Sequence, residues 1–125
     1  MAVVISVPRF GSLEAAVMER MWACDRPVSV RDVLARLDRQ LAYTTVQTVM
    51  EALHRKGWLH RRRDGRANLY SVAATREDYV SALLGEALDQ AADRPAALLR
   101  LVETLDAPDA ERVRHALWTA GRAQR

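Results

Sequence analysis

The feature that most constrains this chain is a change in its apolar period after Gly57. Before that glycine, apolar residues recur at helical spacing, whereas residues 58–63 and 66–72 have the composition of two short extended strands. Asp64-Gly65 stands between these runs, and Asp-Gly in that place is a strong signal for a tight hairpin turn, because glycine tolerates positive φ. The sequence therefore predicts a helical region followed by a β-hairpin.

Two helices are expected at the start of the helical region. Ser12 is placed to cap a first helix over residues 13–24, and Pro27 stops it. Ser29 to Asp32 matches the capping-box pattern S-x-x-[DE], so a second helix of about 10 residues is expected to begin there.

A third helix is predicted from about Tyr43 to Lys56, ended by Gly57. Its apolar stripe consists of Val46, Val49, Met50 and Leu53. Its opposite face is polar but mostly uncharged near the start of the helix, where short side chains can approach another surface closely. The residues of that face are Thr44, Gln47, Thr48, Glu51 and Arg55.

A loop made of Asp64-Gly65 also predicts the register of the hairpin. The expected pairs are Arg63 with Arg66, Arg61 with Asn68, and Leu59 with Tyr70. Such a hairpin has an apolar base and a cationic tip. Two arginine side chains opposite one another repel, so an anionic partner would relieve this arrangement.

The rest of the chain returns to a helical period. A fourth helix is expected from Thr75, a fifth with Pro95 in its first turn, and a sixth that begins at about Asp106 and closes near Gly121. Each has an apolar stripe, and three short helices with few partners have more apolar surface than they can hide alone.

Charge is distributed unevenly within the net charge of +3. Residues 1–73 carry a net +5 and residues 74–125 a net −2. The stretch from Arg55 to Arg66 holds six cations and one acid, as a polyanion-binding surface would. A solvated basic loop would give the same count, so charge alone does not decide between the two.

Three helices followed by a basic-tipped hairpin are the layout of a winged helix-turn-helix, and the predicted fold class is mainly α. In a helix-turn-helix, the N-terminal residues of the last helix meet base edges in the major groove. Glutamine can pair with adenine, and threonine offers a hydroxyl and a methyl group. The candidate base-reading residues are Tyr43, Thr44, Thr45, Gln47 and Thr48. The candidate backbone-contacting residues are Arg31, Arg55, Lys56, Arg61, Arg62, Arg63 and Arg66.

Some of these residues have a simpler interpretation. Thr45 or Thr48 can instead face the protein interior. The three tryptophans are better explained as core or interface anchors than as base-stacking platforms; they are Trp22, Trp58 and Trp118.

Two segments resemble the penicillinase repressors of the BlaI/MecI type. The first is Ser12–Trp22, and the second is Ala42–Met50, followed by Leu53, Lys56-Gly57 and a hairpin that ends in Leu69-Tyr70. The resemblance covers residues 10–118. It implies a sequence-specific DNA-binding repressor in which a winged-helix domain, residues 10–73, binds a palindromic operator.

The same resemblance implies a homodimer, because a two-fold axis matches a palindrome. Residues 74–125 would then form a helical dimerisation region, and residues 1–9 an N-terminal arm. The residues expected at or near the interface are Leu84, Leu88, Leu98, Leu101 and Leu117.

The inducing signal stays open. β-Lactam-controlled members of the family are inactivated when a membrane sensor-protease system leads to cleavage in the C-terminal helices, often at an Asn-Phe bond. The aligned place reads Leu99-Arg100-Leu101-Val102 and lacks that pair. Copper-responsive relatives of the CopY type carry a cysteine cluster near the C-terminus, and this chain has no cysteine after Cys24.

No catalytic residue, metal site or cofactor is expected. The histidines are scattered at His54, His60 and His115, and Cys24 is more typical of a small core residue than of a nucleophile. No secretory signal or apolar stretch of about 20 residues is present, so a cytoplasmic protein associated with the nucleoid, without membrane insertion, is expected. Two alternatives remain: a winged-helix protein-interaction module without DNA specificity, and a repressor that senses a small ligand in a pocket between its helices.

Overall fold

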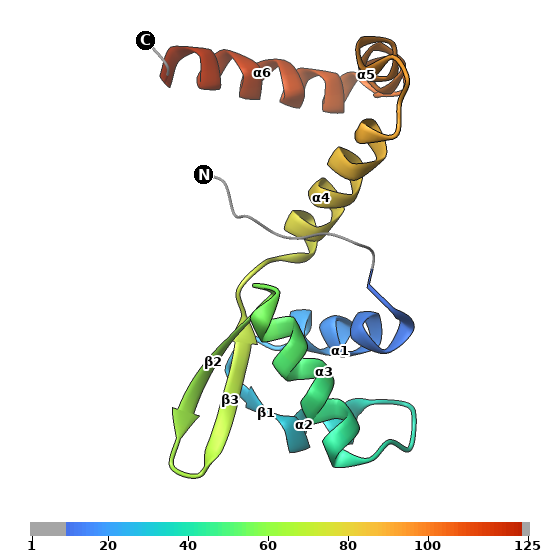
Figure 1. Ribbon diagram of the computed structural model, residues 1–125. Helices are drawn as coiled ribbons and strands as arrows, with labels where there is room; N and C mark the ends of the chain where they lie inside the picture. Colours follow the sequence, from blue (N-terminus) through green and yellow to red (C-terminus); the bar gives the residue numbers. More distant parts are fainter. Residues whose placement is uncertain (1–9, 124–125) are drawn as a thin grey trace. The chain divides into compact units, whose positions relative to one another are not determined.

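The computed structural model describes residues 10–123, and the predicted N-terminal arm, residues 1–9, lies outside them. The chain forms two compact units that meet in sequence at Leu84 and Gly85. The first unit contains three helices and a small sheet, in the predicted order (Figure 1). Its elements are α1 (Ser12–Trp22), β1 (Val28–Ser29), α2 (Val30–Arg36), α3 (Tyr43–Arg55), β2 (Leu59–Asp64), β3 (Ala67–Val72) and the beginning of α4 (Arg76–Asp89). The mainly α, winged helix-turn-helix fold class is confirmed.

The beginnings of α1 and α2 test the predicted caps. At α1 the N-cap is Gly11 rather than Ser12, and the Gly11 N–H donates to the carboxylate of Glu14 at 3.1 Å. The prediction failed because a glutamate in the first turn satisfies this backbone donor without a serine cap. At α2 the capping box is confirmed: Ser29 Oγ accepts from Asp32 N at 3.1 Å, and Asp32 Oδ2 accepts from Ser29 N at 3.0 Å.

The boundaries of α1, α2 and α3 differ slightly from those predicted. Helix α1 ends at Trp22, well before Pro27, and α2 is 7 residues long. Helix α3 begins at Tyr43 as expected and ends at Arg55. Gly57 follows it with φ of +90°, the left-handed conformation that closes helices.

The sheet is antiparallel and three-stranded, with strand order β1-β3-β2. Strand β1, which pairs Val28 with Tyr70 and Ser29 with Leu69, was not predicted. Its 2 residues are too few to show a period, so only the partner strand reveals it.

The predicted hairpin register is wrong. Strands β2 and β3 pair Leu59 with Val72, Arg61 with Tyr70, and Arg63 with Asn68. The last pair is Asp64 with Ala67, so the turn residues are Gly65 and Arg66, and Gly65 has φ of +64°. A glycine in the first central position is typical of a type II′ turn, whereas the prediction placed it second, as in type I′. Arg63 therefore does not face Arg66, and the expected repulsion between them does not occur.

The core of the first unit lies between the helices and the sheet. From α3, the side chains of Val46, Met50 and Leu53 are fully buried, which confirms that part of the stripe, while Val49 is half-buried. Trp58 is a core residue, as interpreted, and Trp22 packs against the core with its Nε1 donating to Ala74 O at 3.0 Å. The other large buried side chains are Val17, Met18, Met21, Val33, Leu59 and Tyr70.

The remaining helices are α4, α5 (Arg94–Glu103) and α6 (Ala107–Ala123). Thr75 caps α4, because its Oγ1 accepts from Asp78 N at 3.0 Å. Asp93 caps α5, and Pro95 lies in its first turn as predicted. Helix α6 continues past Gly121 to Ala123. Within residues 10–123, no helix has the length and apolar character that crossing a membrane requires.

Candidate nucleic-acid interface

The N-terminal end of α3 is an exposed polar surface. Tyr43, Thr44, Thr45 and Thr48 are exposed, and Gln47 is half-buried. Neither Thr45 nor Thr48 therefore faces the protein interior. The Thr48 hydroxyl donates to Thr44 O at 2.8 Å, so it offers acceptor lone pairs and a methyl group, rather than a free donor, to anything above it.

The same helix end is electrostatically open to anions. Its N-cap is Ala42, whose methyl group cannot bond the first-turn N–H groups, and that turn holds no acid. By contrast, Glu14 and Asp32 lie in the first turns of α1 and α2. The positive end of the α3 dipole is thus left without a negative side chain of its own.

A cation from α2 joins this surface. The guanidinium carbon of Arg31 lies 5.6 Å from the centroid of the Tyr43 ring, a cation–π contact between the starts of α2 and α3. Arg31 is exposed, so it stays available to a partner that meets Tyr43. The sequence proposed both residues, but only the fold shows that they are neighbours.

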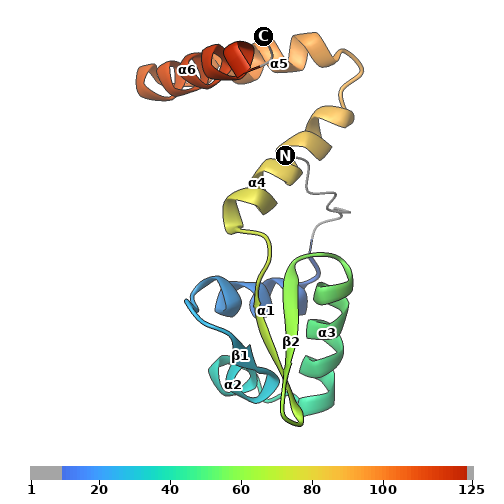
Figure 2. The ribbon, with the colours of Figure 1, turned by 90° about the vertical axis from the view of Figure 1, so that its left-hand side faces the viewer.

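The hairpin supplies four further cations. Arg61, Arg62, Arg63 and Arg66 are all exposed. Arg63 Nε donates to Gly65 O at 3.1 Å, so this side chain is held at the turn. Figures 1 and 2 both place the tip of the hairpin at the same end of the first unit as the N-terminus of α3. The predicted base-reading residues and the cationic tip therefore belong to one surface.

Two predicted backbone-contacting residues lie elsewhere. Arg55 and Lys56 are at the C-terminal end of α3, a helix of 13 residues, so about 20 Å separates them from Tyr43. Lys56 Nζ pairs with Glu14 Oε2 at 2.7 Å, which links α3 to α1. Burial raises the pKa of Glu14, but the hydrogen bonds from Lys56 and from the Gly11 N–H bring it below the ordinary value. Lys56 thus has a structural partner, which the sequence did not reveal.

The predicted dimerisation residues are largely exposed. Leu84 lies in the first unit and is 50% exposed, and Leu88 is half-buried. Leu98, Leu101 and Leu117 lie on α5 and α6 and are exposed. Neither helix contains a buried residue, and further large apolar side chains are exposed there, which the prediction did not include. These are Leu99, Val102, Val113 and Trp118.

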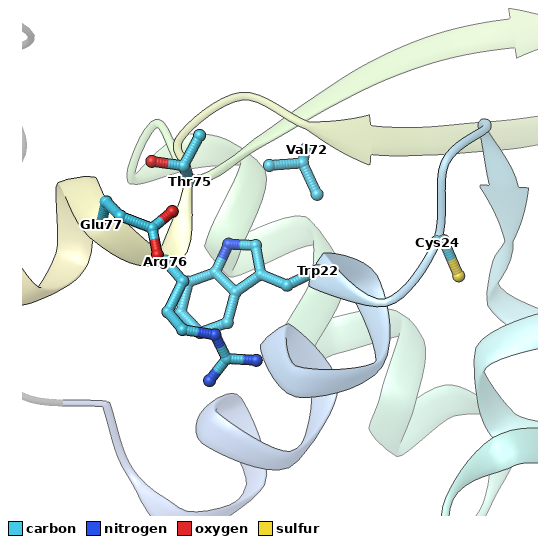
Figure 3. A pocket seen from close by; sticks show the side chains of 6 residues that line it. All are labelled: Trp22, Cys24, Val72, Thr75, Arg76 and Glu77. Atoms are coloured by element: carbon cyan, nitrogen blue, oxygen red, sulfur yellow. The ribbon is translucent and has the colours of Figure 1, made fainter.

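A shallow cavity of about 340 Å³ lies in the first unit, beside Trp22 (Figure 3). Arg76 stacks over that ring, 4.9 Å from its centroid, and pairs with Glu19. The charged group over the ring is therefore already satisfied within the protein. Among the residues described, no three His, Cys, Asp or Glu side chains gather as metal ligands would.

Comparison with known proteins gives a concordant result. The model of the penicillinase repressor family matches residues 10–119. The transcriptional regulator BlaI from two strains of Mycobacterium tuberculosis is 42% identical over 114 residues, which cover 87% of this chain and 83% of that protein. The solution structure of the DNA-binding domain of the repressor BlaI matches with a TM-score of 0.52 at 24% identity, over 61% of this chain and 94% of that domain. The family match spans both compact units.

Proposed function

The chain belongs to the penicillinase repressor family, a family of transcriptional repressors and not of enzymes, and from this premise we propose that it represses transcription by binding a palindromic operator as a homodimer. The observation that carries the proposal is the single surface formed by the N-terminus of α3 and the arginine-rich hairpin tip. Residues 10–73 would form the DNA-binding domain and residues 74–125 the dimerisation region. Operator binding would also place the protein on the nucleoid.

Base readout is assigned to the start of α3. Gln47 can bond the N6 and N7 edge of adenine, and Thr44, Thr45 and Thr48 can contact thymine methyl groups. The exposure of the three threonines supports this assignment, as does the absence of an acid from the first turn of α3. Tyr43, stacked with Arg31, lies at the edge of the same surface.

Phosphate contacts are assigned first to the hairpin tip and Arg31. Arg55 and Lys56 can contact phosphates only if the DNA follows α3 along its length. We therefore expect them to contribute less to the binding affinity than the hairpin tip and Arg31. If each protomer neutralises about three phosphates, a dimer neutralises about six, and the logarithm of affinity should fall with the logarithm of salt concentration at a slope near −5. Raising the salt from 50 to 200 mM would then weaken binding roughly a thousandfold.

The test begins with duplexes selected by the purified protein from a random pool. Arg63→Ala should weaken binding to every duplex alike and flatten the salt slope, whereas Gln47→Ala should change the selected sequence. Arg26→Ala is the charge-matched control, because this exposed residue lies outside α3 and the hairpin. A chain that binds no duplex, or binds with a flat salt response, refutes the proposal.

Dimerisation is supported by the exposed apolar side chains of α5 and α6. Leu117 is 68% exposed, and a monomer in water would leave it and its neighbours hydrated. Sedimentation equilibrium should give the mass of a dimer, and Leu117→Glu should shift the equilibrium to monomer with weaker operator binding. A wild-type monomer at micromolar concentration would contradict this part of the proposal.

We extend the proposal to release of repression by a sensor-protease system that acts on the C-terminal helices. The stretch Leu99-Arg100-Leu101-Val102 lies within α5 and is exposed, but its helical backbone must open locally before a protease can bind it. Mass spectrometry of the protein recovered from induced cells tests this. An intact chain after induction would favour a ligand-sensing mechanism instead.

A further inference from the structure

Arg61 and Arg62 are neighbours on β2 and project to opposite faces of the sheet. The hairpin of β2 and β3 that carries them is called the wing below. Successive residues of a strand alternate between faces, and residues directly opposite on paired strands share a face. Arg61 lies opposite Tyr70, and Arg62 lies opposite Leu69. Because Tyr70 is fully buried in the core, its face is the one that packs on the helices. Arg61 therefore projects to the helix side of the wing, and Arg62 projects away from it.

Tyr70 has an unusual environment for a core residue. None of its surface is exposed, and among the described residues its hydroxyl oxygen has no hydrogen-bond partner. A buried hydroxyl without a hydrogen-bond partner lowers the stability of the fold. We therefore expect a nearby donor or acceptor to bond this hydroxyl in some state of the protein. The ring itself is part of the core cluster, so packing alone would be served by phenylalanine.

The groups around this hydroxyl come from the two elements of the DNA-binding surface. Burial raises the pKa of Tyr70, the nearby Arg61 guanidinium opposes that rise, and the nearby Glu51 and Tyr43 side chains add to it. Glu51 and Tyr43 belong to α3, and Arg61 belongs to β2. The hydroxyl is thus located where the hairpin of β2 and β3 meets α3.

We propose that Tyr70 is a positioning residue for DNA binding: its hydroxyl accepts a hydrogen bond from the Arg61 guanidinium and holds that side chain on the α3 side of the wing. This inference rests on the proposed function and adds a role for a buried residue that does not itself touch DNA. A guanidinium has five N–H donors, so one can bond Tyr70 while the others bond a phosphate. Fixing this long side chain in advance reduces the entropy lost when DNA binds.

The inference predicts that Arg61 and Arg62 play different roles in DNA binding, although the two residues are adjacent and identical in charge. Arg61 would contact DNA from a fixed position beside α3. Arg62 would contribute only general attraction, and its contribution would not depend on Tyr70. This difference supplies a matched control for every measurement.

The experiment is a pair of double-mutant cycles on the selected operator duplex. Tyr70→Phe should weaken binding about fivefold, a loss of the size expected when one long side chain must be ordered on binding. In an Arg61→Ala background, Tyr70→Phe should have no further effect, because its partner is gone. In an Arg62→Ala background it should again cost about fivefold. Wild-type affinity in Tyr70→Phe, or a fivefold loss in both backgrounds, would overturn the inference.

Stability measurements separate positioning from folding. Tyr70→Phe keeps the buried ring and removes only the hydroxyl, and the exposed Arg61 guanidinium it would release can bond water instead, so the unfolding midpoint in urea should lie close to that of the wild type. A lower midpoint together with equal loss in both backgrounds would show a structural role only.

A further readout does not require DNA. The Nε–H resonance of Arg61 in an NMR spectrum of the free protein should shift in Tyr70→Phe, and that of Arg62 should not. If the wild type binds no duplex, the proposed function fails, and this spectrum still tests the contact. Unchanged Arg61 resonances would refute it.

Discussion

The replacement of Tyr79 by alanine should destabilise the first unit strongly, although this residue lies far from the DNA-binding surface in sequence. Tyr79 belongs to the first turns of α4 and contacts three aromatic rings. Its ring is stacked on Phe10 at a centroid distance of 4.3 Å, and it meets Trp58 edge-on at 5.4 Å and Trp22 at 5.9 Å. Its hydroxyl also accepts a hydrogen bond from Phe10 N at 3.1 Å.

The magnitude follows from these contacts. Each aromatic pair contributes about 0.5–1.5 kcal/mol beyond its buried area, and three pairs are lost together. Because Tyr79 is only half-buried, the cavity contribution is smaller than for a fully buried ring, and we expect a total loss of about 3 kcal/mol. Tyr79→Phe keeps the rings and removes only the hydroxyl, so it should cost about 1 kcal/mol.

Urea unfolding at a fixed protomer concentration measures both variants, because a dimer's stability depends on concentration. Trp22 and Trp58 lie in the aromatic cluster and report its loss by fluorescence, while Trp118, 60% exposed on α6, is a poor reporter of this unit. Circular dichroism should give the same midpoint if the transition is two-state.

The ranking of the two variants is the decisive result. A Tyr79→Ala protein within 0.5 kcal/mol of the wild type would show that the four rings do not stabilise the fold. Equal losses in Tyr79→Ala and Tyr79→Phe would show that the hydroxyl, and not the stacking, is responsible.

Three smaller perturbations test other parts of the first unit. Ser29→Ala removes one half of the α2 capping box and should lower the unfolding free energy by about 1 kcal/mol in urea, whereas Ser12→Ala, at a position that does not cap α1, should cost less. Gly65→Val should cost about 1–2 kcal/mol, because φ of +64° is strained for a side chain, and amide exchange in β2 and β3 should accelerate. Hydrogen bonding from Arg76 lowers the pKa of Glu19 below its ordinary value of 4.5. The Glu19–Arg76 pair therefore adds to the free energy of unfolding above that pH, and its contribution is lost as the pH falls through the folded-state pKa of Glu19. Glu19→Gln should therefore have a flatter stability profile than the wild type between pH 6 and 3, and identical profiles would contradict the pairing.

The candidate surface was predicted more completely than its internal arrangement. The apolar stripe of α3 places Thr44 and Thr48 on the opposite face of the helix, and both are exposed. Thr45 is exposed too, although the sequence left its direction open, as it did for Thr48. The stripe contains no information about Lys56, whose partner Glu14 lies 42 positions away in the chain. It also contains none about which residue of β3 lies opposite Arg61, because that depends on the register of β2 against β3.

The sequence by itself determined the elements that depend on neighbouring residues. The Ser29–Asp32 capping box, the glycine after α3 and the proline in the first turn of α5 each act within one helical turn, so a local pattern is sufficient to predict them.

Tertiary structure alone decided the contacts between distant segments. Strand β1 exists only because β3 is there to pair with it, and the Phe10–Tyr79 bond joins residues 69 positions apart. Such contacts form when the whole core fixes the positions of both partners, because the entropy of bringing distant segments together is lost once for the complete fold. For that reason the burial of Tyr70 on the helix side of β3, and its position opposite Arg61, are properties of the folded domain.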